Sequence, residues 1–254
     1  MSEAALEGVA RTALWTLHCR ASYAARGVLE DPEAERIAAG LDAQLLARLG
    51  PPNRCFADRA AHFDAALRRY LAAHPQAPVV SLGEGLETQR FRVQGYGRWT
   101  SVDLPEVLAV RERFIAADVD HTHIAGSATD HARWWPALGE GPAFVVAQGL
   151  FMYLDERDVS ALVEALADRG EVGLVFDVVP PWLSALSRFR PPMSRGLRVP
   201  RMPWGTDGAG LRERLRRWAG PGAEVTVSRL DMPGGPLPIQ LPTAGATVTW
   251  PVTA

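Results

Sequence analysis

A glycine turn and a carboxylate further along the chain are the residues here whose types and spacing could do chemistry. The apolar run from Pro78 to Leu82 is typical of a short buried strand and leads into Gly83 and Gly85. Two glycines at this spacing let the backbone turn sharply and approach a ligand closely. Asp103, 18 residues beyond Gly85, closes the next apolar run. This pattern predicts an α/β protein that holds an adenosine-containing ligand.

Two cofactors of this kind fit the turn differently. A dinucleotide-binding turn carries a third glycine three residues after the second, and that position is Thr88. S-adenosylmethionine (SAM) carries no phosphate, and its ribose hydroxyls suit a carboxylate such as Asp103. The sequence therefore favours SAM over NAD. Asp103 could instead cap a helix that starts in the segment DLPEV, and this alternative stays open.

The elements that must position these residues begin with a helical region. Residues 1–76 have apolar side chains at helical spacing, which predicts helices from Glu3 to Ala25, from Asp31 onward and from Phe56 to Ala73. Asp31 can cap the second helix, and Pro32 suits its first position. We expect this part to form an all-helical N-terminal cap that contributes to the cofactor and substrate pocket.

Residues 77–254 have a different texture, in which apolar runs alternate with amphipathic segments. The runs PVVSL, RWTSVDL, HTHIAG, AFVVAQG and VGLVFDVV predict strands of a mostly parallel sheet, with helices on both faces. The segment from Trp182 to Trp204 is predicted to be an irregular excursion. A helix over Leu211 to Trp218 and two closing strands, expected as an antiparallel hairpin, complete this α/β core.

Composition excludes several classes of partner. The net charge is −2 and the chain contains no lysine, so we expect neither nucleic acid nor membrane as a partner. Cys19 and Cys55 have no metal-ligand or disulfide spacing, and His121 and His123 lack a third ligand, so no metal is expected. No signal segment and no apolar run near ~20 residues is present. These features predict a soluble, cytoplasmic protein.

Several segments in order resemble the leucine carboxyl methyltransferase family. They are TALWTLHCRASYA, DRAAHFDAAL, VVSLGEGLETQRFRV, VDLPEVLAVRERF and AFVVAQGLFMYLDERDV, and they extend from about Arg11 to Ala167. This group of SAM-dependent O-methyltransferases includes enzymes that methylate the C-terminal leucine of protein phosphatase catalytic subunits and bacterial enzymes that tailor polyketides. The resemblance implies a Rossmann-like class I methyltransferase sheet for residues 77–254.

The resemblance also implies roles for two arginines. Arg59 stands four residues before Phe63 and Asp64, and in relatives this arginine holds the methionyl carboxylate of SAM, a task that suits a bidentate guanidinium. A basic residue of the first helix, matched by Arg20, lies beside the same end of the cofactor. The alternative for both is a solvated position on a helix face.

The remaining cofactor contacts follow from the same comparison. The residues implied are Gly83, Gly85, Glu87, Asp103, Leu104, Ser127, Ala128, Gln148 and Gly149. Relatives usually have aspartate at the position of Glu87, Asp-Leu beside the adenine at Ser127 and Ala128, and glutamate facing the methionyl ammonium at Gln148. An amide still accepts a hydrogen bond but adds no negative charge. We therefore expect weaker cofactor binding or a shifted substrate preference.

Two residues are candidates for the transfer step. Tyr153 lies in the segment that forms the methyl-transfer end of the pocket in relatives, where a phenol could orient the acceptor oxygen; simple core packing is the alternative. A carboxylate acceptor needs no general base, whereas a phenol with a pKa of about 10 would benefit from a histidine. His18 is the preferred candidate, because the first helix should cover the pocket.

Three functions follow from these observations. The first is a SAM-dependent O-methyltransferase acting on a carboxyl or hydroxyl oxygen of a small molecule, such as a natural-product intermediate. The second, motivated by Glu87, Ser101 and Gln148, is a degenerate protein of the same fold that binds cofactor or ligand without methyl transfer. The third is an NAD-binding protein, which Thr88 disfavours. A homodimer is compatible with the sequence.

Overall fold

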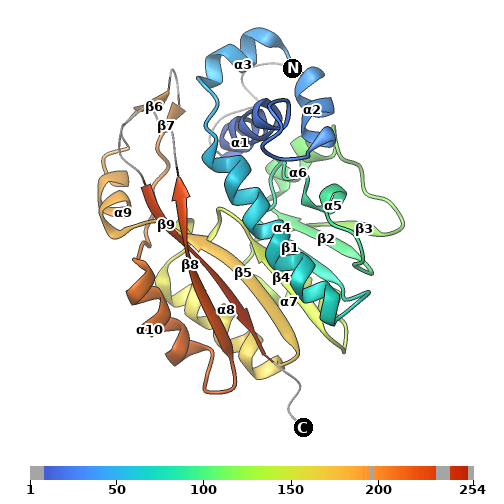
Figure 1. Ribbon diagram of the computed structural model, residues 1–254, viewed down its shortest axis with the longest axis vertical. Helices are drawn as coiled ribbons and strands as arrows, with labels where there is room; N and C mark the ends of the chain where they lie inside the picture. The colour runs from blue at the N-terminus through green and yellow to red at the C-terminus, as the bar shows by residue number, and fades with distance from the viewer. Residues whose placement is uncertain (1–8, 191, 195–196, 233–240, 251–254) are drawn as a thin grey trace.

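The fold is built around one mixed sheet (Figure 1). The computed structural model describes residues 9–190, 192–194, 197–232 and 241–250. The strand order in the sheet is β3-β2-β1-β4-β5-β9-β8. Its strands are β1 (Val79–Leu82), β2 (Trp99–Asp103), β3 (His121–Ala125), β4 (Ala143–Ala147), β5 (Val172–Val178), β8 (Glu224–Met232) and β9 (Leu241–Thr249).

Strand direction divides the sheet into two parts. Strands β1 to β5 run parallel to one another, whereas β9 lies antiparallel to both β5 and β8. The central strands β4 and β5 are buried along their whole length, as near-continuous apolar strands covered on both faces should be. The parallel strands and the closing hairpin are confirmed.

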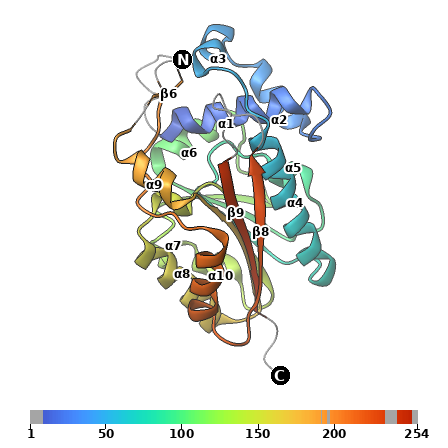
Figure 2. The ribbon, with the colours of Figure 1, turned by 60° about the vertical axis from the view of Figure 1, so that its left-hand side comes forward.

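Helices cover both faces of the sheet, as Figure 2 shows with α4 and α5 on one side and α7, α8 and α10 on the other. The helices that follow β1 are α5 (Gln89–Arg92), α6 (Pro105–Arg111), α7 (His131–Trp134), α8 (Glu156–Arg169), α9 (Pro181–Ser187) and α10 (Gly208–Trp218). Short 3-10 turns occupy Trp135–Leu138 and Phe151–Tyr153. The expected α/β fold class is confirmed.

The chain is helical from residue 9 up to β1. These helices are α1 (Val9–Ala24), α2 (Pro32–Ala39), α3 (Ala43–Leu49) and α4 (Cys55–Ala73). Asp31 caps α2 by accepting a hydrogen bond from the amide of Ala34, with Pro32 at the first position, as expected. The helix predicted from Asp31 onward is interrupted after Ala39, so α3 is a separate helix; its start is fixed by the Asp42 side chain, which accepts from the amides of Gln44 and Leu45.

Two apolar clusters attach these helices to the sheet. On α4, Phe63 and Leu67 pack against Phe144 and Val146 of β4. The second cluster joins Leu14 of α1 to other helical residues and also to Leu86, which belongs to the loop after β1. Burial of whole aliphatic and aromatic side chains contributes about 1.5–3 kcal/mol each. The helical segment is therefore packed directly onto the loop that carries the glycine turn.

Two segments differ in detail from the sequence expectation. The segment after the glycine turn forms only a single helical turn, α5, because Glu87 and Thr88 are engaged in hydrogen bonds just before it and β2 begins soon afterwards. The excursion from Trp182 to Trp204 contains most of α9 and the short pair β6 (Pro192–Ser194) and β7 (Leu197–Arg198). Within the described ranges, no helix is long and apolar enough to cross a membrane.

Candidate functional site

The glycine turn lies where the order of strands in the sheet reverses direction. Strands β1 and β4 are neighbours, but β1 leads on to β2 on one side and β4 to β5 on the other. Loops that leave neighbouring parallel strands in opposite directions open a crevice at their carboxyl ends, and ligands of α/β proteins bind there. The loop after β1 carries Gly83 and Gly85, and the loop after β4 carries Gln148 and Gly149.

Three positions in these two loops have backbone conformations that favour glycine. Gly83, Gly85 and Gly149 have φ values of 61°, 56° and 70°, which side chains rarely adopt. A Cβ on Gly83 would lie 2.8 Å from Leu150 Cδ1, and one on Gly85 would lie 3.2 Å from Ala13 Cβ. The turn is therefore enclosed by the β4 loop on one side and by helix α1 on the other.

Asp103 fastens the glycine turn to the end of β2. Its Oδ2 accepts a hydrogen bond from the amide of Gly85 at 2.7 Å, and its Oδ1 accepts from the amide of Leu104 at 2.8 Å. The N-cap residue of α6 is Leu104, so Asp103 is not itself the cap. Burial raises the pKa of Asp103 and the two amides oppose this effect. Each oxygen keeps acceptor capacity, as a ribose site requires.

Ser127 and Ala128 follow β3 beside this carboxylate. The register places Asp103 opposite Ala125, and the amide of Gly126 donates to the Asp103 carbonyl at 2.9 Å. Ser127 Oγ is 2.8 Å from Thr129 Oγ1, and Ala128 is 8% exposed. These residues remain adenine-side candidates by position.

A buried ionic network lies beneath the turn. Glu87 Oε2 is 3.1 Å from Arg20 Nη1, and its Oε1 is 2.9 Å from Arg92 Nη1. Arg92 also pairs with Asp31 and Asp64, each at 2.8 Å. Burial alone would raise the pKa of Glu87, but the charges of Arg20 and Arg92 outweigh it and hold the pKa at about 2. Glu87 is therefore ionised at neutral pH.

Arg20 is a member of this network and not a solvated arginine. It is 1% exposed, and its Nη2 donates to the carbonyl of Leu86 at 2.6 Å. It therefore connects helix α1 to the loop after β1. Its contact with a cofactor stays a prediction.

Gln148 bridges the two loops of the crevice. Its Nε2 donates to Glu87 Oε2 at 2.8 Å. Its Oε1 is buried and has no hydrogen-bond partner among the described residues. A buried acceptor left without a donor costs about 1–3 kcal/mol, so this oxygen is a favourable contact point for a ligand donor.

Arg59 and Asp177 form a second polar centre at the same edge. Arg59 Nη1 lies 3.3 Å from Asp177 Oδ2, and Asp177 Oδ1 accepts from the amide of Gly149 at 2.6 Å. A Cβ on Gly149 would lie 3.0 Å from Arg59 Nη1, so the guanidinium lies against this loop. Arg59 is one-tenth exposed at its side chain and is not a freely solvated arginine.

The two candidates for the transfer step differ in their surroundings. Burial raises the pKa of Tyr153 to about 12, with the Arg59 charge opposing and the Asp177 charge adding to the effect, so the phenol stays protonated. Burial lowers the pKa of His18, so its imidazole is neutral at pH 7. No hydrogen bond joins these two side chains in the described part of the chain. Their catalytic roles stay predictions.

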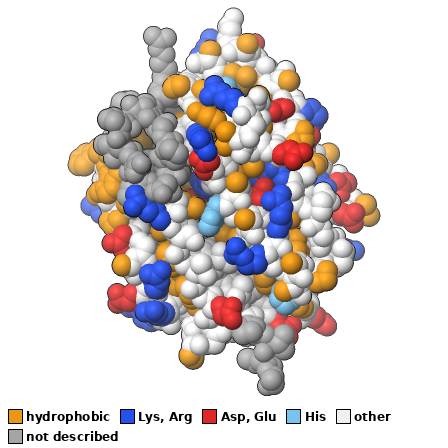
Figure 3. Space-filling model, in the orientation of Figure 1, with side chains coloured by type: hydrophobic (Ala, Val, Ile, Leu, Met, Phe, Trp, Pro, Cys, Tyr) orange, Lys and Arg blue, Asp and Glu red, His pale blue; other side chains and the backbone are white. Residues whose placement is uncertain are grey.

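Several other groups are accounted for by structure alone. Burial raises the pKa of the free thiols Cys19 and Cys55 to about 11 and about 12, which makes them poor nucleophiles. No group of three or more histidine, cysteine, aspartate or glutamate side chains among the described residues is suited to a metal. On the face shown in Figure 3, basic side chains (blue) and acidic side chains (red) are interspersed.

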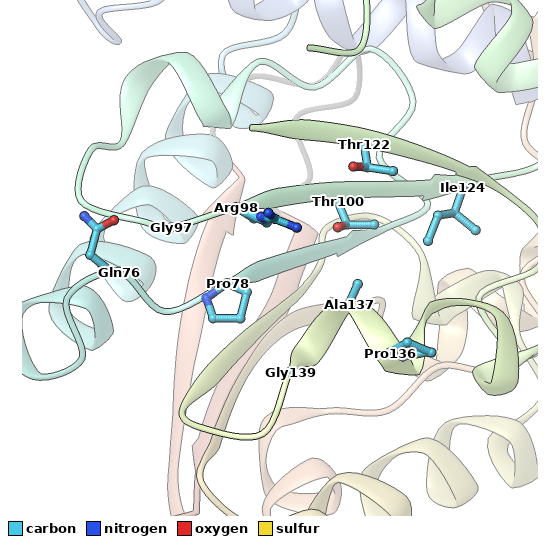
Figure 4. Close-up of a pocket in the computed structure, with 10 residues that line it drawn as sticks. All are labelled: Gln76, Pro78, Gly97, Arg98, Thr100, Thr122, Ile124, Pro136, Ala137 and Gly139. Carbon is cyan, nitrogen blue, oxygen red and sulfur yellow. The ribbon is translucent and has the colours of Figure 1, made fainter. Parts of the chain in front are cut away.

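A hollow of about 530 Å³ lies elsewhere, at the amino ends of β1 and β2 (Figure 4). Its lining includes Gln76, Pro78 and Arg98, together with Pro136 and Gly139 from the segment before β4. Arg98 is the one ionisable side chain of this lining, and the glycine turn lies at the opposite ends of the strands. This hollow offers little chemistry, and the crevice at the carboxyl ends is the better candidate.

Sequence reasoning missed Asp177 and Arg92. Asp177 carried a usable signal, because it is an acidic residue inside the apolar run VGLVFDVV. Arg92 carried none, since nothing in its spacing distinguishes it from other arginines of the chain. Asp31 was interpreted only as a helix cap, and its pairing with Arg20 and Arg92 depends on the tertiary fold.

Solved structures of methyltransferases share this fold. A protein from Thermobifida fusca YX assigned as a methyltransferase superposes with a TM-score of 0.57 at 14% identity, covering 78% of this chain and 82% of that one. Human N-acetylserotonin methyltransferase in complex with SAM gives 0.50 at 10% identity, over 78% and 53%. These likenesses show the α/β fold of methyltransferases.

Sequence comparison defines the family. Residues 9–167 match the profile of the leucine carboxyl methyltransferase family. The chain is also 32% identical over 192 residues to the tetracenomycin polyketide synthesis O-methyltransferase TcmP of Streptomyces glaucescens, which covers 72% of this chain and 71% of that protein. The chain belongs to the leucine carboxyl methyltransferase family and is a SAM-dependent methyltransferase.

Proposed function

We propose that this protein is a SAM-dependent O-methyltransferase whose acceptor is a carboxyl or hydroxyl oxygen of a small molecule, a natural-product intermediate. The 32% identical relative is an O-methyltransferase of polyketide synthesis, which supports this class of acceptor. The observation that carries the proposal is the meeting of the β1 and β4 loops at the carboxyl ends of their strands, where Asp103 holds the glycine turn and Arg59 lies beside Gly149. The free cysteines Cys19 and Cys55 suit a cytoplasmic location.

The residues of the crevice fit a cofactor with a charged amino-acid end and a ribose. Asp103 keeps acceptor capacity for ribose hydroxyls, and Arg59 has a buried Nε without a partner among the described residues. The orphaned Oε1 of Gln148 is an acceptor on the same edge. The residues thus supply a cation, an anion and a neutral acceptor to one ligand.

When bound, SAM supplies a methyl group on a sulfonium, which is transferred by in-line displacement. The protein must align the acceptor oxygen and exclude water. Tyr153 stays protonated and orients the acceptor oxygen by donating a hydrogen bond. A carboxylate acceptor arrives ionised, and for a hydroxyl acceptor His18 takes up the proton.

Calorimetry with SAM and a mass-spectrometric transfer assay test this proposal. We expect SAM to bind, and at least one aromatic carboxylic acid or phenol of polyketide type to gain one methyl group with release of S-adenosylhomocysteine. Wild-type protein that binds no SAM at millimolar concentration contradicts the proposal.

The amide at Gln148, where the family resemblance implies glutamate, supports a second candidate function. In that case the protein binds SAM or another ligand and transfers no methyl group. Binding of SAM without S-adenosylhomocysteine release over a broad panel of carboxylic acids, phenols and alcohols favours this second function.

A further inference from the structure

The hydrogen bond between Glu87 and Gln148 is the direct side-chain link across the crevice. Glu87 belongs to the loop after β1, and Gln148 belongs to the loop after β4. A ligand bound between these two loops would lie next to this pair. The bond joins two loops that leave the sheet in opposite directions.

The chemistry of Glu87 fixes which way the Gln148 amide points. An ionised carboxylate only accepts hydrogen bonds, whereas an amide has one donor end and one acceptor end. Because Arg20 and Arg92 keep Glu87 ionised, the donor end of Gln148 must face it. Oε1 then points away from Glu87, and this oxygen is the buried atom without a partner.

The charge around the pair favours a cation on that oxygen. In the buried network Arg20 and Arg92 meet the carboxylates of Asp31, Asp64 and Glu87, and the adjoining Arg111 meets Glu84, so three positive charges face four negative ones. Arg68 reaches Asp64 only at 3.9 Å and is half exposed, where water screens its charge. A positively charged donor is therefore the best match for Oε1.

We propose that Glu87 is a positioning residue, which orients Gln148 so that its Oε1 accepts a hydrogen bond from the ammonium group at the amino-acid end of the cofactor. This inference rests on the proposed function, because it takes SAM as the ligand. Glu87 acts through Gln148 and supplies the negative charge that the amide itself lacks. The length of Glu87 matters, since its carboxylate must reach across the crevice.

Two probes isolate the amino-acid end of the ligand. S-adenosylhomocysteine carries the ammonium group, and 5′-methylthioadenosine lacks the whole amino-acid end. Calorimetry on wild type should give clearly tighter binding of S-adenosylhomocysteine. In the Glu87→Gln variant we expect its Kd to rise about tenfold or more, the scale of one hydrogen bond to a charged group. The Kd of 5′-methylthioadenosine should stay within about twofold.

A reciprocal exchange separates orientation from simple damage. The double variant Glu87→Gln/Gln148→Glu keeps the number of charges and the hydrogen bond but reverses its direction, so an anionic oxygen now faces the ligand. We expect it to recover the preference for S-adenosylhomocysteine. The matched control is Asp118→Asn, which removes a carboxylate that pairs with Arg90 outside this network. It should change the Kd of both probes by the same small factor.

Each outcome decides a different question. Wild type that binds neither probe contradicts the proposed function. Wild type that binds both probes equally, or a folded Glu87→Gln variant that keeps its preference, overturns the positioning role alone. The same holds for a folded double variant that recovers nothing. If Glu87→Gln fails to fold by thermal unfolding, Glu87→Asp takes its place, because the shorter side chain keeps the charge but does not reach Gln148, and the same selective loss is expected.

Discussion

At the scale of single residues, the charge of Arg59 is balanced by the carboxylate of Asp177. It lies on α4, faces Asp177 of β5 and touches Gly149 of the β4 loop. The guanidinium is nearly buried, and its Nε is without a partner in the described ranges. A planar fork with an unused edge suits a second carboxylate.

The Asp177→Asn variant tests this dependence. It keeps an acceptor for the Gly149 amide but leaves the Arg59 cation without its counter-charge. Breaking a buried pair by removing one partner costs about 3 kcal/mol, so we expect a loss of this size in urea unfolding. Saturating S-adenosylhomocysteine should reduce the loss, because its carboxylate returns a negative charge to Arg59. The control Asp130→Asn breaks an exposed pair with Arg133 and should cost less than about 0.5 kcal/mol. Equal losses in both variants contradict the expectation.

His121 should make the stability of the fold depend on pH. It is fully buried, with Nδ1 3.0 Å from Arg90 Nη1 and Nε2 2.7 Å from Ser101 Oγ. Arginine only donates, so Nδ1 accepts and the imidazole is neutral. Burial, and next the charges of Arg111 and Arg90, lower its pKa from 6.5 to about 3.

The sign of the pH effect follows from these two pKa values. As the pH falls through 6.5 the unfolded chain takes up a proton that the folded chain refuses until about 3, so stability decreases over this range. Between pH 6.5 and 5, wild type should lose about 1.6 kcal/mol more than the His121→Gln variant, since the slope rises from half of about 1.4 kcal/mol per pH unit at pH 6.5 towards its full value. Urea unfolding at both pH values measures this difference. Parallel losses in the two proteins would show that His121 does not titrate in this way.

At the scale of elements, the close contact between the β1 and β4 loops makes its own prediction. Gly83→Ala adds strain at a φ of 61° and places a Cβ against Leu150. Gly95→Ala is the control, since Gly95 has a φ of 92° but open space around it. We expect Gly83→Ala to be less stable by a further ~1–3 kcal/mol, the cost of overpacking, and to bind SAM more weakly. Equal unfolding free energies for the two variants would show that the close approach of Leu150 to Gly83 does not affect stability.

The elements show which parts of the fold were predictable. Apolar runs such as that of β5 identify buried strands because a strand covered on both faces needs apolar residues at almost every position. The start of α2 was equally predictable from Asp31 and Pro32. The break between α2 and α3 was not, because the apolar residues of α3, such as Leu49, continue the helical spacing of α2.

The candidate site was predictable only where the chemistry is local. Gly83, Gly85 and Asp103 were found from spacing, and the structure joins Gly85 to Asp103 through one hydrogen bond. The pairing of Arg92 with Asp31 joins residues 61 positions apart, and sequence pattern carries no information about such contacts. Asp177 is an intermediate case. An acidic residue inside the apolar run VGLVFDVV stands out in the sequence, but nothing there predicts that its partner is Arg59.

At the scale of the whole molecule, both polar and apolar contacts join the helical segment to the loop after β1. Arg20 of α1 donates to the Leu86 carbonyl, and Leu86 packs into the core of α1 and α2. Ala13 of α1 lies over Gly85. A ligand in the crevice should therefore stabilise the helices before β1 together with the loops after β1 and β4.

Ligand binding followed by hydrogen exchange tests this coupling. At 100 times its Kd, S-adenosylhomocysteine should stabilise the fold by about 2.7 kcal/mol, which raises Tm by about 5–10 °C for a chain of this size. Amides of α1 and of the segment 83–88 should gain protection together, because both enclose the glycine turn. NAD at the same concentration should change neither Tm nor exchange. Protection confined to residues after 77 would mean that the helical segment is a separate unit, and that Arg20 serves the fold and not the cofactor.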